Sequence, residues 1–280
     1  MSDGFFIEHV IRPETPFNMP ARHYHEHFEI YYLLDGERYY FIENRAYHVK
    51  KGDIVLIGKN ILHKTNTTER HAHERILLLF DNDFLDKFIE NSEDKDLYYC
   101  FRTEQNVFSL DPEKQLWVEN LLFNIIRENK NKDILYQTYI KILIIELLIF
   151  LNRIAKSKTP FTDTDTDPIY EKISEVASYI NSNYSDNLSL NRVAEIFNYS
   201  PTYLSKIFKK VTGFNFVEYK NNVRIKEASK LLLNSELNIT EIASRTGYNN
   251  LTHFGRIFKK ITGYSPFEYK KLKDNKLTPR

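Results

Sequence analysis

The sequence predicts an α+β protein with two domains, in which an N-terminal barrel of short strands and its following helices precede an all-helical C-terminal domain. The chain has 280 residues, a length that favours two domains over one. Short β segments with Gly turns occupy residues 5–80, and a helical segment occurs twice near the C-terminus. The two copies read FKKVTGFNFVEY at 208–219 and FKKITGYSPFEY at 258–269, so a duplicated structural unit is expected.

The first 110 residues are predicted to form a small barrel or sandwich. The strand candidates are rich in Tyr, Ile, Val and Phe, which favour an extended backbone. We expect turns between strands at Asp35-Gly36 and Lys51-Gly52, where glycine permits a tight reversal. The predicted strands are residues 28–34, 39–42, 53–57 and 75–80.

From Asp111 the apolar pattern takes the period of a helix. Asp111 is the expected N-cap and Pro112 the first helical residue, and a second helix is expected from about Asp133 to Lys156. This second helix has more apolar residues than one small contact needs. We therefore expect the segment 111–156 to have apolar surface for a further contact besides the one with the barrel. Residues 157–167 have no apolar period and read as a linker, after which a helical domain spans 168–280.

Charge is distributed unevenly along the chain. The net charge is only +1, but residues 168–280 have 18 lysines and arginines against 10 acidic residues, a balance of +8. Residues 1–167 have a balance of −7. A basic half joined to an acidic half indicates a module that binds a polyanion. Cys100 is the only cysteine, and no signal peptide or membrane-spanning stretch is evident, so we expect a cytoplasmic protein.

The first copy of the repeat is preceded by the signals of a helix-turn-helix. Ser189 is the expected N-cap, and Ala194 lies where two helices must approach closely. Asn198 follows four residues later, at the corner, and asparagine tolerates the positive φ that this corner needs. Ser200-Pro201 then predicts the start of the next helix.

The second copy has the same signals in the same order. Asn238 and Glu241 form a capping box, and Gly247 follows Ala243 by four residues. Both units therefore lead into a helix with an apolar inner face and a polar, basic outer face. The inner residues are Leu204, Ile207, Phe208 and Val211 in the first unit, and Phe254, Ile257, Phe258 and Ile261 in the second. The outer residues are Thr202, Tyr203, Ser205, Lys206, Lys209 and Lys210, and then Asn250, Thr252, His253, Arg256, Lys259 and Lys260.

Residues 168–272 resemble the DNA-binding domain of AraC/XylS-type bacterial transcription regulators. The segment SPTYLSKIFKK at 200–210, Ile242-Ala243, Gly247-Tyr248 and TGYSP at 262–266 carry the resemblance. It implies that each of the two helices enters a major groove of double-stranded DNA. Base contacts would come from Thr202, Ser205 and Lys206 in the first unit and from Asn250, Thr252, His253 and Arg256 in the second. Lys209 and Lys260 would hold phosphate, and Tyr203 lies on the same exposed face.

Residues 23–36 and 52–63 resemble the two sequence motifs of a cupin barrel. The first reads H-x-H-x3-E-x6-G, in which His23, His25 and Glu29 are odd-numbered and would share one face of a strand; the second begins at Gly52-Asp53 and includes His63. In metal-binding cupins the matching residues ligate one divalent metal, and three imidazoles with a carboxylate suit Zn, Fe, Ni, Cu or Mn. The same groups could instead hydrogen-bond an organic effector, and both alternatives stay open.

Together the two resemblances predict a transcription regulator rather than an enzyme. They imply a cupin-like sensor barrel, a homodimer formed through residues 111–156, an operator or promoter as DNA partner, and RNA polymerase as a further partner. A saccharide is the expected effector, by analogy with the many regulators of sugar use in the family. A metal-sensing regulator is the alternative, and a metal-dependent cupin enzyme fused to a DNA-binding domain is a further one.

Overall fold

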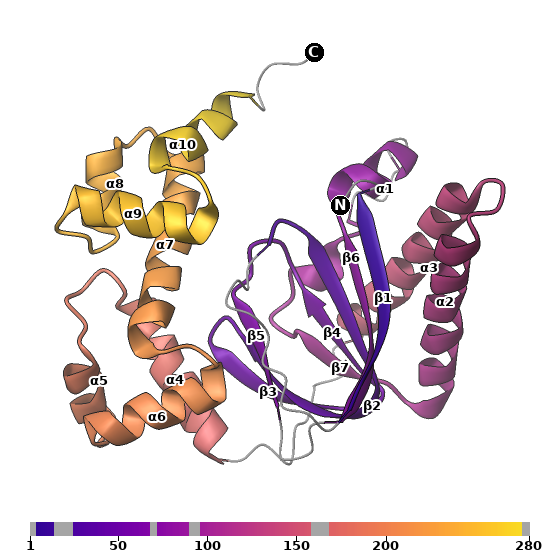
Figure 1. The fold of residues 1–280 in the computed structure, drawn as a ribbon, viewed down its shortest axis with the longest axis horizontal. Helices are drawn as coiled ribbons and strands as arrows, with labels where there is room; N and C mark the ends of the chain where they lie inside the picture. The colour runs from indigo at the N-terminus through magenta and orange to yellow at the C-terminus, as the bar shows by residue number, and fades with distance from the viewer. Residues whose placement is uncertain (1–3, 14–24, 68–71, 90–95, 158–167, 276–280) are drawn as a thin grey trace. The chain divides into compact units, whose positions relative to one another are not determined.

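The computed structural model describes residues 4–13, 25–67, 72–89, 96–157 and 168–275. They divide into two compact units, one built mainly from residues 4–157 and the other from residues 168–275 (Figure 1). The first unit is an antiparallel sheet with helices, and the second is entirely helical, which confirms the predicted fold class. His23 and, apart from Ser157, the predicted linker 157–167 lie outside the described residues.

A seven-stranded sheet forms the N-terminal unit, with the order β1-β6-β2-β4-β7 and with β3 and β5 paired to β2. Every second residue of β2 faces one side, so Phe28, Ile30 and Tyr32 join a different buried cluster from Tyr31 and Leu33. The strands are β1 (Phe5–Arg12), β2 (Phe28–Ile42), β3 (Arg45–Lys50), β4 (Asp53–Ile57), β5 (His63–Thr67), β6 (His73–Phe80) and β7 (Val107–Ser109).

One predicted turn is confirmed and the other is wrong. Gly52 has φ +84 in the turn between β3 and β4, as predicted. Asp35 and Gly36, in contrast, lie inside β2, which joins the two strands predicted at 28–34 and 39–42 into one of 15 residues. The pairing of β2 with β6 slips between Leu33 and Asp35, so these residues form a β-bulge. Gly36 is required there because its φ is +87 and a Cβ would lie 2.6 Å from the carbonyl oxygen of Ala72.

The bulge changes which residues of β2 face the interior of the barrel. Before it, odd-numbered Tyr31 and Leu33 belong to the interior cluster; after it, even-numbered Tyr40 and Ile42 do. A strand alternates its side chains between two faces, and one extra residue therefore reverses the parity. As a result, side chains from both ends of β2 point into the same interior.

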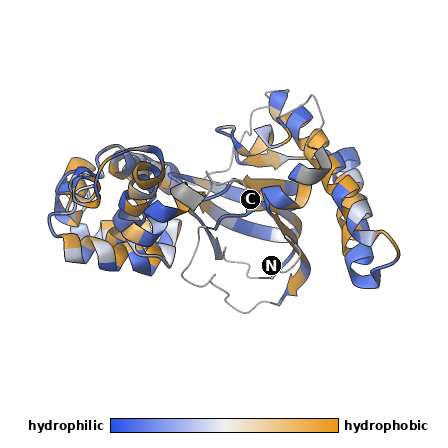
Figure 2. Cartoon of the chain, turned by 90° about the horizontal axis from the view of Figure 1, so that it is seen from above, coloured by the Kyte–Doolittle hydropathy of each residue, from blue (hydrophilic) through white to orange (hydrophobic). Residues whose placement is uncertain are grey.

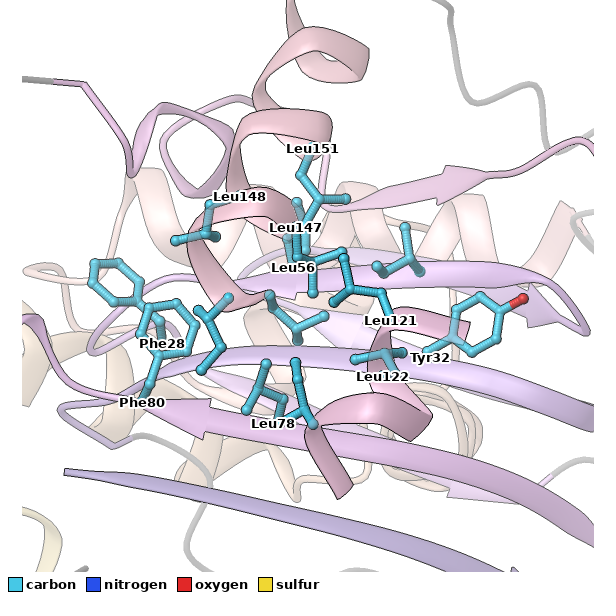
Figure 3. Close-up of a cluster of buried hydrophobic side chains, with 14 of the residues drawn as sticks. Phe28, Tyr32, Leu56, Leu78, Phe80, Leu121, Leu122, Leu147, Leu148 and Leu151 are labelled. Carbon is cyan, nitrogen blue, oxygen red and sulfur yellow. The ribbon is translucent and has the colours of Figure 1, made fainter. Parts of the chain in front are cut away.

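Two long helices cover the outer face of this sheet. α2 (Pro112–Asn131) begins at the predicted N-cap, where Asp111 accepts a hydrogen bond from the Lys114 amide. α3 (Tyr136–Lys156) begins later than predicted, because Leu135 adopts a left-handed φ of 63°. Figure 3 shows the core formed between the helices and the sheet, where Leu121 and Leu122 of α2 and Leu147, Leu148 and Leu151 of α3 lie in one cluster with Phe28, Tyr32, Leu56, Leu78 and Phe80.

The C-terminal unit contains two helix-turn-helix units joined by one long helix. The first consists of α5 and α6, the second of α8 and α9, and α7 connects them. The helices are α4 (Pro168–Ser182), α5 (Leu190–Ile196), α6 (Pro201–Thr212), α7 (Phe216–Asn234), α8 (Ile239–Arg245), α9 (Leu251–Thr262) and α10 (Pro266–Asn275). The N-terminal unit also contains a short helix, α1 (Asn82–Ile89), and a 3-10 turn, η1 (Tyr99–Phe101).

Hydrophilic residues interrupt the hydrophobic ones along the helices, as Figure 2 shows by colour. Within the described ranges, no helix combines the length and the apolar character that crossing a bilayer requires.

Candidate nucleic-acid interface and effector site

The local signals predicted for both helix-turn-helix units are present in the structure. Ser189 caps α5, Asn238 and Glu241 form a reciprocal capping box on α8, and Ser200 caps α6. The two corner residues have positive φ, 57° at Asn198 and 82° at Gly247. At each corner the next amide donates to an alanine carbonyl: Tyr199 to Ala194 at 2.8 Å, and Tyr248 to Ala243 at 2.9 Å. The two units therefore have the same corner geometry.

Most of the predicted outer residues are exposed on α6 and α9. Thr202, Tyr203, Lys206 and Lys209 of α6 and Thr252, His253, Arg256 and Lys260 of α9 are exposed, whereas Ser205 is half-buried. Among the described residues, no carboxylate lies within ion-pair distance of Lys206, Lys209, Arg256 or Lys260, so their charges face solvent. The inner residues Leu204, Phe208, Phe254 and Phe258 are fully buried, and Ile207, Ile257 and Ile261 are half-buried.

Asn250 has a structural role that the sequence prediction did not assign to it. It is the N-cap of α9, and its side-chain oxygen accepts a hydrogen bond from the His253 amide at 2.8 Å. The corresponding cap of α6 is Ser200, which accepts from the Tyr203 amide. The Asn250 oxygen is therefore engaged with the helix, and only its amide nitrogen remains available for a base.

Arg224 on α7 joins the two helix-turn-helix units, and sequence reasoning missed this role. Its guanidinium donates to the carbonyl oxygens of Tyr184, Asp186 and Gly247 at 2.7, 2.8 and 2.7 Å, and it stacks on Tyr248. Burial lowers the pKa of Arg224 from its usual value. The segment before α5 and the corner of the second unit are thus held by one side chain.

A second missed feature follows the repeat itself. Lys220 donates to the carbonyl of Leu188 at 2.6 Å, and Lys270, fifty residues later, donates to the carbonyl of Leu237 at 2.7 Å. Each lysine directly follows the Glu-Tyr pair that ends one copy of the repeat, so this duplication was the signal that could have revealed the contact. Both lysines anchor the segment that precedes a capped helix.

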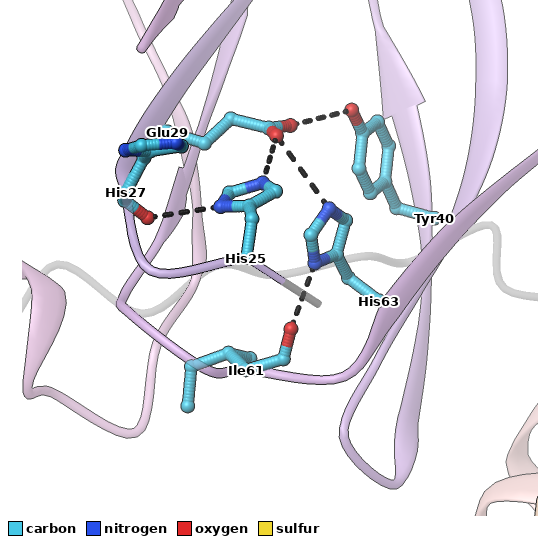
Figure 4. A network of polar contacts seen from close by, with 6 residues as sticks. All are labelled: His25, His27, Glu29, Tyr40, Ile61 and His63. Atoms are coloured by element: carbon cyan, nitrogen blue, oxygen red, sulfur yellow. Dashed lines mark hydrogen bonds and ion pairs between the residues drawn. The ribbon is translucent and has the colours of Figure 1, made fainter. Parts of the chain in front are cut away.

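Three of the four predicted barrel residues converge in the N-terminal unit. Nε2 of His25 lies 3.0 Å and Nε2 of His63 lies 3.5 Å from the same carboxylate oxygen of Glu29 (Figure 4). One ligand atom from each of the three residues lies within 4.8 Å of the others. The prediction placed His25 on a strand, but the residue lies just before β2. Tyr40 donates a hydrogen bond to the second carboxylate oxygen of Glu29 at 3.4 Å. The fourth predicted residue, His23, lies outside the described residues.

Backbone carbonyls orient both imidazole rings. Nδ1 of His25 lies 3.0 Å from the carbonyl oxygen of His27, and Nδ1 of His63 lies 2.8 Å from that of Ile61 (Figure 4). Because a carbonyl oxygen only accepts, Nδ1 of each ring must carry a hydrogen. Nε2 is the ring nitrogen that faces Glu29. Metal-ligating histidines have this arrangement, since the distal N–H is held by an outer acceptor. Without a metal, a bond from Nε2 of His25 to the carboxylate requires the imidazolium form.

The pKa values of the cluster follow from these contacts. Burial alone would raise the pKa of Glu29, but the charge of His63 and hydrogen bonds from His25 and His63 lower it well below its usual value. Burial opposes protonation of His25, yet its hydrogen bond and charge attraction to Glu29 raise its pKa above 6.5. Near neutral pH, Glu29 is therefore an anion, and His25 is protonated to a greater extent than a free imidazole would be.

Comparison with known proteins matches both units to sequence families. A family described as "AraC-like ligand binding domain" matches residues 10–147, and one described as "Helix-turn-helix domain" matches residues 193–272. Between them the two matches cover more than half of the chain. The chain belongs to the AraC family.

Relatives of this AraC-family protein are named as transcription regulators. The HTH-type transcriptional activator RhaS of Salmonella arizonae is 24% identical over 88% of this chain and 85% of its own length. An uncharacterized HTH-type transcriptional regulator of Staphylococcus aureus is 25% identical over 88% of this chain, which spans about a third (32%) of that longer relative. These names agree with the prediction of a regulator rather than an enzyme.

One solved structure is similar to part of the AraC-family chain, and a second is similar to most of it. The C-terminal domain of AraT, a response regulator from Geobacillus stearothermophilus, is 38% identical over 39% of this chain and 88% of that one, with a TM-score of 0.36. ToxT from Vibrio cholerae is 16% identical over 95% of this chain and 98% of that one, with a TM-score of 0.37.

Proposed function

We propose that this AraC-family protein is a cytoplasmic transcription regulator that binds operator DNA through α6 and α9 and a small molecule inside the barrel. The observation that carries the proposal is the pair of capped helices with equivalent corners, on which Lys206, Lys209, Arg256 and Lys260 are exposed and have no ion pair among the described residues. Each such helix fits a major groove, and its Lys and Arg side chains suit phosphate and guanine. Effector binding would bias how the DNA-binding units are held, and RNA polymerase would be the partner at the promoter.

We expect substitutions on α6 and α9 to separate into two classes. Lys206→Ala and Arg256→Ala should each weaken binding to the preferred site by about 1–3 kcal/mol, because they remove a base contact. Each should also relax the sequence preference at one base position of that site. Lys209→Ala and Lys260→Ala should weaken binding to all DNA sequences alike. Each should also reduce the slope of log K against log salt by about one, because one phosphate contact is lost. Fluorescence anisotropy of the full chain, on a site selected from random DNA and on a scrambled duplex, measures both effects.

The outcome distinguishes the DNA-binding proposal from the assignment of roles. If binding of the full chain to DNA is absent or insensitive to salt, the regulator proposal is wrong, because phosphate neutralisation must release counterions. If the two classes of variant behave alike, only the division into base and phosphate contacts is wrong. Lys230→Ala, on the exposed side of α7, is the control and should bind as the wild type does.

A saccharide in the barrel and a homodimer complete the proposal. The saccharide rests on analogy with the family and on the polar side chains, Glu29, Tyr31, Arg38 and Tyr40 among them, that line a cavity of the N-terminal unit. The dimer is supported by apolar residues that remain exposed on one side of α3 at helical spacing, Tyr139, Ile142 and Ile149, and by the exposed Leu135 that precedes the helix. The opposite side of α3 is not available to a partner, because it packs on the sheet of the same chain. Its residues include Leu143, Ile144, Leu147 and Leu148.

A metal-sensing regulator is a second candidate, favoured by the orientation of His25, Glu29 and His63. These residues fit a divalent cation, because two Nε2 atoms and a carboxylate oxygen converge and both rings are oriented by outer acceptors. A bound cation would supply a Lewis-acidic centre for a ligand oxygen.

We expect elemental analysis of protein purified near pH 8 to find bound metal if the cluster is a metal site. The metal should be lost as the pH falls, because protons compete for Nε2. Since Glu29 raises the pKa of His25, that loss should begin at a higher pH than for a free imidazole. His25→Ala should abolish binding, and His48→Ala is the control because His48 pairs with Glu37 outside the cluster. Metal content unchanged in His25→Ala would contradict the assignment.

A further inference from the structure

A second group of polar side chains faces the interior of the barrel beside the His25–Glu29–His63 cluster. Tyr31, Arg38, Tyr40 and Arg75 line, together with Glu29, a cavity of about 30 Å³. They come from both ends of β2 and from β6, and the bulge at Asp35-Gly36 is the reason that Arg38 and Tyr40 share a face with Glu29 and Tyr31. The cavity has room for about two water molecules.

Arg38 is a buried cation that has no carboxylate partner among the described residues. Its side chain is 2% exposed, and neither Nε nor Nη1 has a hydrogen-bond partner among the described residues. The hydroxyl of Tyr31, which is also 2% exposed, has none there either. A guanidinium stays charged in proteins, and a buried charge without a partner is strongly unfavourable. A group that is kept in this state is expected to meet a ligand.

The other charges around the cavity are already balanced. Arg75 donates to Glu8 at 2.7 Å, and Glu29 is paired with His25 and accepts from Tyr40. Burial, together with repulsion from Arg75, lowers the pKa of Arg38, whereas no carboxylate raises it. The cavity therefore has an excess of positive charge at Arg38, together with an unused hydroxyl donor.

We propose that the barrel interior binds the carboxylate group of the effector, with the guanidinium of Arg38 donating to its two oxygens and the Tyr31 hydroxyl as a further donor. The planar fork of arginine matches a carboxylate in this way, and the cavity is comparable in size to that group. The inference rests on the proposed function of the barrel as the effector site. It assigns the chemical class of the effector, an organic acid such as a sugar acid, in place of a neutral saccharide.

The test uses the full chain and three small probes at constant ionic strength in chloride buffer. Acetate carries the proposed group, acetamide has the same shape without the charge, and inorganic phosphate is the competing oxyanion. We expect acetate to raise the melting temperature with increasing concentration, because a ligand that binds only the folded state stabilises it by mass action. Acetamide should leave the melting temperature unchanged.

Variants at Arg38 connect this response to the cavity. Arg38→Met should have a melting temperature at or above that of the wild type without ligand, because it removes an unpaired buried charge, and it should lose the response to acetate. Arg38→Lys keeps the charge but not the fork, and its affinity for acetate should be at least about tenfold weaker. Arg127→Met, on the exposed surface of α2, is the matched control and should respond as the wild type does.

Each result decides the proposal. Equal responses to acetate and acetamide would overturn it, as would an acetate response that persists in both Arg38 variants. Stabilisation by phosphate without stabilisation by acetate would overturn the carboxylate assignment. DNA binding measured on the same preparations tests the proposed function separately, since operator binding without an acetate response rejects only this inference.

Discussion

Replacing Arg224 with methionine is expected to destabilise the C-terminal unit by about 3 kcal/mol. The substitution removes three part-buried hydrogen bonds, to the carbonyl oxygens of Tyr184, Asp186 and Gly247, and each such bond contributes about 1 kcal/mol net. The aliphatic part of the side chain is kept, so most of the loss comes from hydrogen bonds rather than from a cavity. Urea unfolding followed by circular dichroism measures the free energy of unfolding.

The same substitution should impair recognition of a two-part DNA site. Arg224 connects the corner of the second helix-turn-helix to the segment before the first, so without it the spacing of α6 and α9 is less well fixed. We expect binding to a full site to weaken more than binding to a site that engages one unit.

Lys230→Met, on the same helix, removes only an exposed ion pair with Glu227 and should cost less than about 1 kcal/mol. Equal stability of the Arg224 and Lys230 variants would show that Arg224 does not hold the two units together.

Two glutamate substitutions on α3 are expected to have opposite consequences. Ile142 is 45% exposed, so Ile142→Glu should yield a folded monomer, because it places a charge in the proposed dimer surface without disturbing the core. Leu147 is fully buried against the sheet, so Leu147→Glu should unfold the N-terminal unit, with a loss of more than about 4 kcal/mol from a buried unpaired charge and lost packing (Figure 3). Sedimentation velocity and thermal melts separate the two effects.

The dimer proposal depends on the first of these variants. A wild type that sediments as a monomer at micromolar concentration would contradict it, and so would an Ile142→Glu protein that stays dimeric. If Leu147→Glu remained folded, the assignment of that face of α3 to the core of the same chain would be wrong.

The C-terminal unit could be predicted from sequence because its signals are local. A cap such as Ser200 or Asn238 bonds an amide three residues away, and a corner such as Gly247 needs only its own backbone angle. The exposed faces of α6 and α9 follow from a helical period that repeats after fifty residues. What remained unpredicted there is Arg224, because its acceptors lie 23 to 40 residues away in sequence and no local pattern marks them.

In the N-terminal unit the sequence predicted strand segments at 28–34, 39–42, 53–57 and 75–80 and the N-cap at Asp111. The cupin resemblance predicted that His25, Glu29 and His63 lie together. Which residues share the interior of the barrel depends instead on how strands that are distant in sequence pair. A glycine after an aspartate is compatible with either a turn or a bulge, and the choice depends on β6 pairing alongside β2 through this point. Because a bulge shifts the alternation of side chains by one residue, that pairing places Arg38 and Tyr40 beside Glu29. In the same way, the apolar pattern of α3 has two sides, and only packing against the sheet shows which side is buried.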